Sequence, residues 1–565
     1  MAFVAPIGIS DFRLLRQHGA TYVDKTASIG RVLASPTQAL LFPRPRRFGK
    51  TLWLSTLQAF VERGDDDRAA LFGDLAIWGH AAARAHMGRH PVVFMTFKDV
   101  KHDTWQACSE AVRSLIAQAF KAHREVRPAL SGMDAEMFDA VAEERASEVR
   151  LAGSLAFLSE ILHRHHGERV VLLIDEYDTP IHAGYSHGYY DQAVGFFRNF
   201  LSGGLKDNSH LFKGVLTGIL RVAKESIFSG LNNLDVFSLL RSEHAESFGF
   251  TESEVEALAH AAGAGAHLTT LRDWYNGYAF GGRVIYNPWS VIKFLDDADK
   301  RPQAHWVATG SDDILRRLIT GGYLGSLSEQ EALLRGEAVE RAIVEPIALR
   351  DVDRVGDAVW SFLLFSGYLT ATEVTYGDDG VRARLRIPNR EIRLVYTSLV
   401  AGWLERGLGG AHAVDSLLQG LLAGDAERVE QWLERLLITH VSYHDLPRPA
   451  GELPYHMFVL GLLVRLAADY DVHSNREAGF GRADVTIAPR QPGRPGVIIE
   501  LKSLDPHRDA SPEAALEAAL AQIQARAYAT ELRDRGARPI HCYAAVFDGK
   551  RAYVRVRRDD AGTTG

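Results

Sequence analysis

Cysteine is almost absent from this chain, since only Cys108 and Cys542 occur among its 565 residues. Two thiols so far apart in sequence build neither a disulfide framework nor a cysteine-rich metal site, which makes a reducing cytoplasm the expected location. The chain also lacks a run of about 18 consecutive apolar residues, the length that a transmembrane helix needs. Residues 1–10 hold no basic segment leading into an apolar one. We therefore expect a soluble, cytoplasmic protein with no membrane partner.

An excess of positive charge is missing as well. The chain has 64 Lys and Arg against 71 Asp and Glu, which gives a net charge of −7. Proteins that hold nucleic acid through bulk charge are strongly basic, so any contact with nucleic acid must be local here. The 565 residues, 46% of them hydrophobic, exceed what one core normally contains, and we expect several domains.

The first 235 residues alternate short apolar runs with longer helical patterns. This alternation predicts an α/β domain with a mostly parallel sheet and crossover helices. The expected strands are apolar enough to be buried on both faces. They are Gln38–Phe42, Val92–Phe97, Val170–Ile174 and Phe212–Thr217, with a helix at Thr51–Arg63.

A phosphate-binding loop is expected between the first of these strands and that helix. Such a loop reads Gly-x-x-x-x-Gly-Lys-Thr, because its backbone N–H groups cradle phosphates and its lysine reaches the outer ones. Gly49-Lys50-Thr51 fits this motif, although Arg44 stands where the first glycine is expected. The residues predicted to bind ATP are Arg46, Arg47, Phe48, Gly49, Lys50 and Thr51, and Thr51 is also predicted to bind Mg²⁺.

An acidic pair follows the apolar run at Val170–Ile174. Asp175 is predicted to bind the magnesium ion and Glu176 to act as the base for the attacking water. The alternative is a buried strand with acidic residues at its exposed end. A further strand ends at Thr217, a candidate sensor of the γ-phosphate, and Arg221 beyond it is a candidate for stabilising the transferred phosphate.

The middle of the chain is mainly helical from Thr251 to about Glu340. Aromatic residues gather at Trp274–Phe280, where stacking on bases is one interpretation and packing of a helical lid is the one we favour. Gly367–Pro388 predicts a hairpin with its turn at Tyr376–Gly380.

A second candidate site lies near the C-terminus, where Asp484 precedes a strand that ends in Glu500-Leu501-Lys502. Side chains two apart on a strand share a face, so Glu500 and Lys502 can both meet Asp484 across a hairpin. Asp484 and Glu500 are predicted ligands of Mg²⁺ or Mn²⁺, and Lys502 is predicted to hold or deprotonate the attacking water. Glu477 is a further candidate ligand. The alternative is an ion pair at a sheet edge.

Five segments together resemble the bacterial AAA-ATPase-like family, whose members commonly end in a PD-(D/E)xK nuclease-superfamily domain. They are Tyr22–Thr26, Arg44–Thr51, Ile174–Pro180, Gly218–Asn233 and Trp274–Pro288. An arginine-rich loop without its first glycine is typical of that family. The resemblance implies an ATPase coupled to a nuclease, and the Gln-to-Tyr pattern of the family makes Gln522 a candidate substrate contact.

The C-terminal pattern resembles the α-β-β-β-α-β core of the nuclease superfamily. The expected elements are helix Tyr455–Ala468, strand Val472–Asn475, hairpin Gly479–Ile487, strand Val497–Lys502, helix Pro512–Leu532 and strand Ile540–Phe547. The expected domains are a P-loop AAA-like ATPase domain at 1–240, a helical lid at 241–345, a winged-helix-like and helical linker region at 346–440 and a restriction-endonuclease-like domain at 441–565.

The expected function is ATP binding and hydrolysis coupled to metal-dependent cleavage of nucleic acid, DNA or RNA. The alternative is an ATP-driven switch or adaptor whose C-terminal domain binds nucleic acid or a partner without cutting. A homo-oligomer stays open, because ATPases of this general kind often take an arginine from a neighbouring subunit.

Overall fold

The computed structural model describes most of the chain. The described residues are 3–221, 233–306, 318, 325–345, 347, 349, 352, 356–408, 410–440, 461–462, 465–466, 469–478, 481–504, 511–525, 528–548 and 551–559. The chain forms two compact units: the first comprises Met1–Ile314 and Glu340–Ile392, and the second comprises Leu315–Val339 and Arg393–Gly565.

A five-stranded parallel sheet organises the first unit, with the strand order β2-β3-β4-β1-β5. The strands are β1 (Ala39–Pro43), β2 (Val92–Thr96), β3 (Val170–Asp175), β4 (Leu211–Gly218) and β5 (Leu234–Val236). Every residue of β1 and β3 is buried, as their apolar runs predicted. The expected parallel α/β sheet is thus confirmed.

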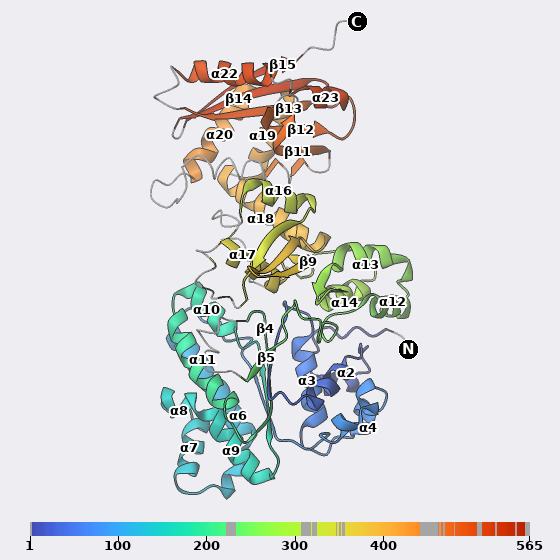
Figure 1. Ribbon diagram of the computed structural model, residues 1–565, viewed down its shortest axis with the longest axis vertical. Coiled ribbons are helices and arrows are strands. Elements are labelled where there is room, and N and C mark those ends of the chain that lie inside the picture. The colour runs from blue at the N-terminus through green and yellow to red at the C-terminus, as the bar shows by residue number, and fades with distance from the viewer. Residues whose placement is uncertain are drawn as a thin grey trace. The chain divides into compact units, whose positions relative to one another are not determined.

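Helices cover both faces of this sheet (Figure 1). On one face lie α1 (Phe12–Gln17), α2 (Thr26–Ala34), α3 (Lys50–Val61), α4 (Arg68–Phe72), the 3₁₀ helix η1 (Ala76–Gly79) and α5 (Ala81–Arg84). The other face carries α6 (Trp105–Ala122), η2 (Arg124–Ala129), α7 (Gly132–Ala142), α8 (Glu148–Ala152), α9 (Ser154–His166), α10 (Thr179–His187) and α11 (Tyr190–Leu205).

Smaller elements complete the first unit. They are α12 (Glu252–Ala261), η3 (Gly265–His267), α13 (Leu268–Tyr275), the hairpin β6 (Tyr278–Phe280) and β7 (Arg283–Ile285), α14 (Pro288–Asp296), α17 (Gly356–Ser366) and a sheet of order β8-β10-β9. That sheet consists of β8 (Val339–Ile343), β9 (Thr370–Gly377) and β10 (Gly380–Arg386). Strands β9 and β10 form the predicted hairpin. Tyr275, Tyr278 and Phe280 are at most 1% exposed, which confirms that these aromatic residues belong to the core.

The second unit is built on a five-stranded sheet of order β11-β12-β13-β14-β15. Its strands are β11 (Tyr470–Ala478), β12 (Gly481–Pro489), β13 (Gly496–Ser503), β14 (Ile540–Asp548) and β15 (Arg551–Asp559). Only β13 and β14 are parallel, and β12 pairs with β13 so that Val485 lies opposite Ile499.

Helices flank this sheet as well, with α22 on one face and α19 and α20 on the other (Figure 1). The helices of this unit are α16 (Leu327–Arg335), α18 (Arg390–Leu408), α19 (Ala411–Ala423), α20 (Ala426–His440), α22 (Pro512–Ala525) and α23 (Thr530–Asp534). Helix α18 begins at the end of the first unit and continues along the chain into the second.

Two C-terminal elements differ from the prediction. The single helix expected at Pro512–Leu532 is two helices, because α22 ends at Ala525 and α23 begins at Thr530. Strand β15 was not predicted, although Ala552, Val554 and Val556 alternate with Arg551, Arg555 and Arg557, which was a usable signal. Of the helix expected at Tyr455–Ala468, all but residues 461–462 and 465–466 lie outside the described residues.

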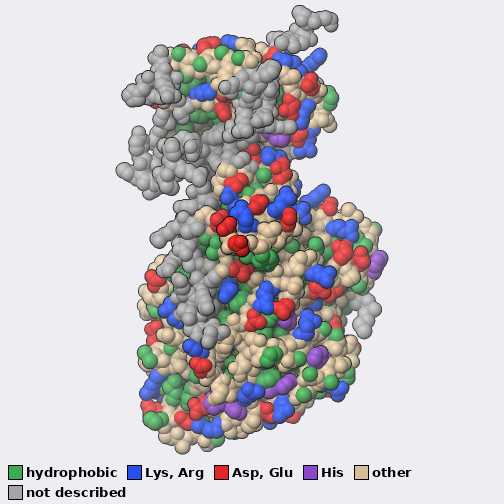
Figure 2. All heavy atoms as spheres, viewed as in Figure 1, with side chains coloured by type: hydrophobic (Ala, Val, Ile, Leu, Met, Phe, Trp, Pro, Cys, Tyr) green, Lys and Arg blue, Asp and Glu red, His purple; other side chains and the backbone are tan. Residues whose placement is uncertain are grey.

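Charge is evenly mixed on the displayed face, where Lys and Arg side chains lie interspersed with Asp and Glu side chains (Figure 2). This distribution agrees with a net charge of −7 and with local contacts to any polyanion. Within the described ranges, no helix is both long enough and apolar enough to cross a bilayer.

Candidate functional site

The loop between β1 and α3 has the backbone of an anion-binding site. Arg47 and Gly49 take left-handed conformations, with φ of 66° and 84°, and Gly49 is the N-cap of α3. These turns bring the loop to the start of a twelve-residue helix. The first N–H groups of a helix have no intrahelical acceptor, and its dipole favours negative charge at that end. The loop is therefore suited to phosphate.

Arg44 explains how the loop forms without its first glycine. Its side chain is fully buried and points into the protein, where it donates hydrogen bonds to the carbonyls of Phe237 (2.6 Å) and His244 (3.2 Å). Its guanidinium also lies over the rings of Phe248 and Phe280, 5.3 and 5.4 Å from their centroids. Burial lowers the pKa of Arg44 to about 9. Arg44 thus anchors the loop from behind and does not face the phosphates.

Asp175 gathers the hydroxyl groups at the carboxyl ends of the strands. Its Oδ2 accepts hydrogen bonds from Thr51 (2.7 Å) and Thr96 (3.2 Å), and its Oδ1 accepts one from Thr217 (2.6 Å). The structure therefore brings together three residues predicted from the sequence, Thr51, Asp175 and Thr217. Thr96 was missed, although its position at the end of β2, next to β3, was a usable signal. The oxygen atoms of Asp175 and Thr51 fit Mg²⁺, which prefers hard oxygen ligands.

Lys50 lies inside the loop. Its ammonium group is 3.1 Å from the carbonyls of Arg44 and Pro45 and 3.1 Å from Glu176 Oε1. Glu176, directly after β3, has a φ of 53°. The predicted base and the predicted phosphate-binding lysine are therefore neighbours at the same edge of the sheet.

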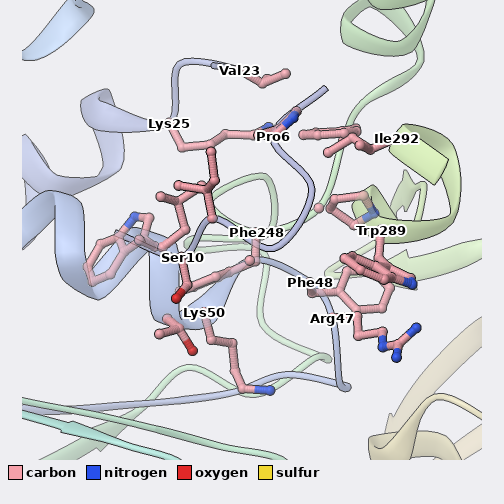
Figure 3. Close-up of a pocket in the computed structure, with 18 of the residues that line it drawn as sticks. Pro6, Ser10, Val23, Lys25, Arg47, Phe48, Lys50, Phe248, Trp289 and Ile292 are labelled. Carbon is pink, nitrogen blue, oxygen red and sulfur yellow. The ribbon is translucent and has the colours of Figure 1, made fainter. Parts of the chain in front are cut away.

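A cavity of about 330 Å³ opens beside the loop (Figure 3). One wall is the segment Arg47–Trp53, and the others come from Pro6–Ser10, Thr21–Lys25 and from Trp289 and Ile292 on α14. Apolar walls next to a phosphate loop suit a nucleoside. Sequence reasoning assigned only Arg47–Thr51 of these walls to a site, although Tyr22–Thr26 was among the segments that carried the family resemblance.

Asp178 is a second residue that the sequence reasoning passed over. It is fully buried, and its Oδ2 accepts hydrogen bonds from the backbone N–H groups of Ile219 (2.8 Å) and Leu220 (2.9 Å). Burial raises the pKa of Asp178, but the nearby His182 and these N–H groups bring it below its ordinary value. A Cβ on Gly218 would lie 2.6 Å from Asp178 Oδ1. Asp178 therefore fixes the turn that follows Thr217.

Arg221 lies elsewhere. It lines a separate cavity with Arg241 and Glu345, and its carbonyl accepts a hydrogen bond from the N–H of Ile347 (3.2 Å). Residues 222–232, which belong to the segment Gly218–Asn233, lie outside the described part of the chain.

The C-terminal centre forms where β12 and β13 run side by side. Asp484 Oδ2 accepts a hydrogen bond from the N–H of Leu501 (2.7 Å), and Lys502 Nζ is 3.1 Å from Glu500 Oε1. Gln522 of α22 contacts both ends of that pair: it accepts a hydrogen bond from Lys502 (3.1 Å) and donates one to Glu500. The structure thus brings together all four of these residues predicted from the sequence.

This centre suits a divalent cation held by few protein ligands. Glu500 is 2% exposed, and burial raises the pKa of Asp484 while the Leu501 N–H and Lys502 oppose that shift. Across the described residues, no three His, Cys, Asp or Glu side chains gather to hold a metal ion. Mg²⁺ commonly binds through one or two carboxylates and keeps several waters, so Asp484 and Glu500 fit it. The side chain of Glu477 lies outside the described residues.

Two parts of the chain match known protein families. Residues 6–228 match the family model described as predicted AAA-ATPase, of the AAA-ATPase-like family. Residues 450–556 match the model of the PD-(D/E)XK nuclease superfamily. A protein of Azotobacter chroococcum mcd 1, described as an uncharacterized protein in the vnfD 5′ region, is 28% identical over 558 residues, 96% of each chain.

The role of Arg44 predicts a large effect on stability. Arg44→Met removes the guanidinium that donates to the carbonyls of Pro43 and Phe237 and one of the two donors to the carbonyl of His244, so we expect a loss of about 2–5 kcal/mol in the free energy of unfolding. Thermal denaturation monitored by circular dichroism would show this as a lower first transition. Arg46→Met, in the same loop but only half-buried, is the matched control. Equal destabilisation by both variants would contradict the anchoring role.

Proposed function

We propose that this chain, which joins an AAA-ATPase-like domain to a PD-(D/E)XK nuclease-superfamily domain, hydrolyses ATP and cuts nucleic-acid phosphodiester bonds with Mg²⁺ or Mn²⁺. One observation carries the proposal: residues far apart in sequence meet in each centre with the right chemistry. Thr51 contacts Asp175 in the first, and Asp484 contacts the strand of Glu500 and Lys502 in the second.

In the first centre, the N–H groups at the start of α3 bind the ATP phosphates and Lys50 neutralises the outer ones. Thr51 and Asp175 would hold a magnesium ion through their oxygen atoms, and the ion would neutralise negative charge on the phosphates. Thr217 and Thr96 keep the Asp175 carboxylate oriented through their hydroxyl groups. Glu176 orients the attacking water and accepts its proton.

In the second centre, Asp484 and Glu500 supply the carboxylate oxygens that hold the metal ion. When bound, the ion polarises the phosphate and lowers the pKa of a water molecule. Lys502 positions that water and offsets the negative charge that develops on the phosphorus oxygens. Gln522 holds Lys502 and Glu500 in place through its two hydrogen bonds. Because the chain as a whole is acidic, we expect nucleic acid to bind through local contacts.

Lys50→Ala tests the nucleotide site. Removing the ammonium group that faces the outer phosphates should weaken binding of a non-hydrolysable ATP analogue by about tenfold or more, since charge-assisted contacts are the strongest in such loops. Isothermal titration calorimetry measures this loss. Lys121→Ala is the matched control, because Lys121 is exposed on α6. Unchanged affinity in Lys50→Ala would refute the assignment.

Asp484→Asn tests the nuclease centre. Loss of one carboxylate charge should reduce metal-dependent cleavage by about 100-fold or more, because the metal would lose one of its two ligands. The assay uses labelled single- and double-stranded DNA and RNA with Mg²⁺ or Mn²⁺. Asp548→Asn, at the exposed end of β14 in the same sheet, is the matched control. Cleavage by Asp484→Asn at the wild-type rate would contradict the proposal.

A further inference from the structure

Arg47 lies in the wall of the nucleotide cavity but is held by the protein itself. Its guanidinium donates a hydrogen bond to the carbonyl of His305 (2.5 Å) and stacks on the ring of Trp289, 4.6 Å from the centroid. Burial lowers the pKa of Arg47, and the carboxylate of Glu391 opposes that shift. Figure 3 shows Arg47 next to Trp289 at the side of the cavity. A cationic side chain in a phosphate loop is thus bound to a neutral carbonyl.

The segment that binds Arg47 also contacts the rest of the loop. Trp306, the neighbour of His305, donates its indole N–H to the carbonyl of Arg46 (3.2 Å). At the start of this segment, the hydroxyl oxygen of Tyr275 accepts a hydrogen bond from the backbone N–H of Gln303 (3.1 Å). This bond fixes the first residue of the segment. Residues 303–306 therefore form a short bridge with one end fixed and the other attached to the phosphate loop.

The same bridge contacts the first turn of α18. The backbone N–H of Trp306 donates to Glu391 Oε1 (2.8 Å). Glu391 is fully buried and also accepts the hydroxyl of Ser290 (2.9 Å), the residue after Trp289 on α14. Two short paths thus lead from Arg47 to Glu391, one through His305 and Trp306 and the other through Trp289 and Ser290.

Several groups of the bridge and of α14 act on the carboxyl group of Glu391. Burial raises its pKa to about 7, while the Trp306 N–H, the Ser290 hydroxyl, the His305 N–H and Arg47 oppose that shift. A carboxylate in the first turn is favoured by the helix dipole. Helix α18 begins in the first unit and continues along the chain into the second. A change in the contacts of Glu391 therefore occurs where the chain passes from one unit to the other.

We propose that Arg47 reports nucleotide occupancy to α18 by exchanging the carbonyl of His305 for a nucleotide phosphate. A guanidinium binds phosphate through charge-assisted, often bidentate hydrogen bonds, which are stronger than a bond to a neutral carbonyl. The two states are therefore Arg47 bound to His305 and Arg47 bound to phosphate. In the second state the bridge is released, and its hydrogen bond to Glu391 weakens. This inference rests on the proposed binding of ATP.

Hydrogen exchange of the full-length chain tests the exchange of partners. We follow the amides of residues 390–396 with and without a saturating non-hydrolysable ATP analogue. In the wild type we expect the analogue to speed exchange by about tenfold, the effect of losing roughly one hydrogen bond to a charged group. In Arg47→Met we expect fast exchange already without the analogue and no further change with it.

A second variant covers the case in which Arg47→Met does not fold. Glu391→Gln keeps an acceptor for Trp306 but loses the charge, and hydrogen bonds to neutral groups are about half as strong. Because the bridge is then released more easily, we expect somewhat tighter binding of the analogue and a smaller response at residues 390–396. Arg272→Met, exposed on α13 and paired with Glu252, is the matched control and should respond like the wild type.

The outcomes separate this inference from the proposed function. If calorimetry shows that the wild type binds no nucleotide, both are overturned. If it binds the analogue but exchange at residues 390–396 does not change, the role of Arg47 is overturned and ATP binding stands. If Arg47→Met, saturated with the analogue, shows the same change in exchange at residues 390–396 as the wild type, the role of Arg47 is overturned as well.

Discussion

The buried guanidinium of Arg44 is the interaction on which the nucleotide side of this protein depends. A charged group with no solvent exposure must have its donors satisfied by the protein. The carbonyls of Pro43, Phe237 and His244 accept hydrogen bonds from its two terminal nitrogens, and its charge lies over the rings of Phe248 and Phe280. These partners come from the chain after β5 and from the hairpin strand β6, so the loop is held by segments that pack behind it.

A second set of interactions lies at the carboxyl ends of the strands, next to the loop that Arg44 anchors. In parallel sheets the carboxyl ends of neighbouring strands meet at one edge, and ligands bind there. Asp175 binds hydroxyl groups from the ends of β2 and β4 and from the start of α3, while Asp178 fixes the turn after β4. The carbonyl of Gly218, in that turn, accepts a hydrogen bond from the backbone N–H of Arg44 (2.9 Å). The loop and the acidic strand are thus tied into one network.

Much of this was predictable from the sequence, because motif residues follow strands whose apolar runs are easy to recognise. Thr51 lies beside Asp175, and Asp484 lies beside the strand of Glu500 and Lys502, as their motifs and spacing predicted. The inward direction of Arg44 was not predictable, since tertiary packing decides whether an arginine in a loop faces a ligand or the core. Trp289 was missed for the same reason.

We propose that one chain carries two phosphate chemistries, ATP hydrolysis and nucleic-acid cleavage, and that the two are coupled, as expected from the sequence. The most direct measurement is the rate of Mg²⁺-dependent cleavage of labelled nucleic acid by the wild type, with and without ATP. The account predicts cleavage of at least one class of nucleic acid at a rate that ATP changes, by roughly tenfold if the coupling free energy is typical. Cleavage at one rate regardless of ATP, or no cleavage of any substrate while ATP is bound, would contradict it.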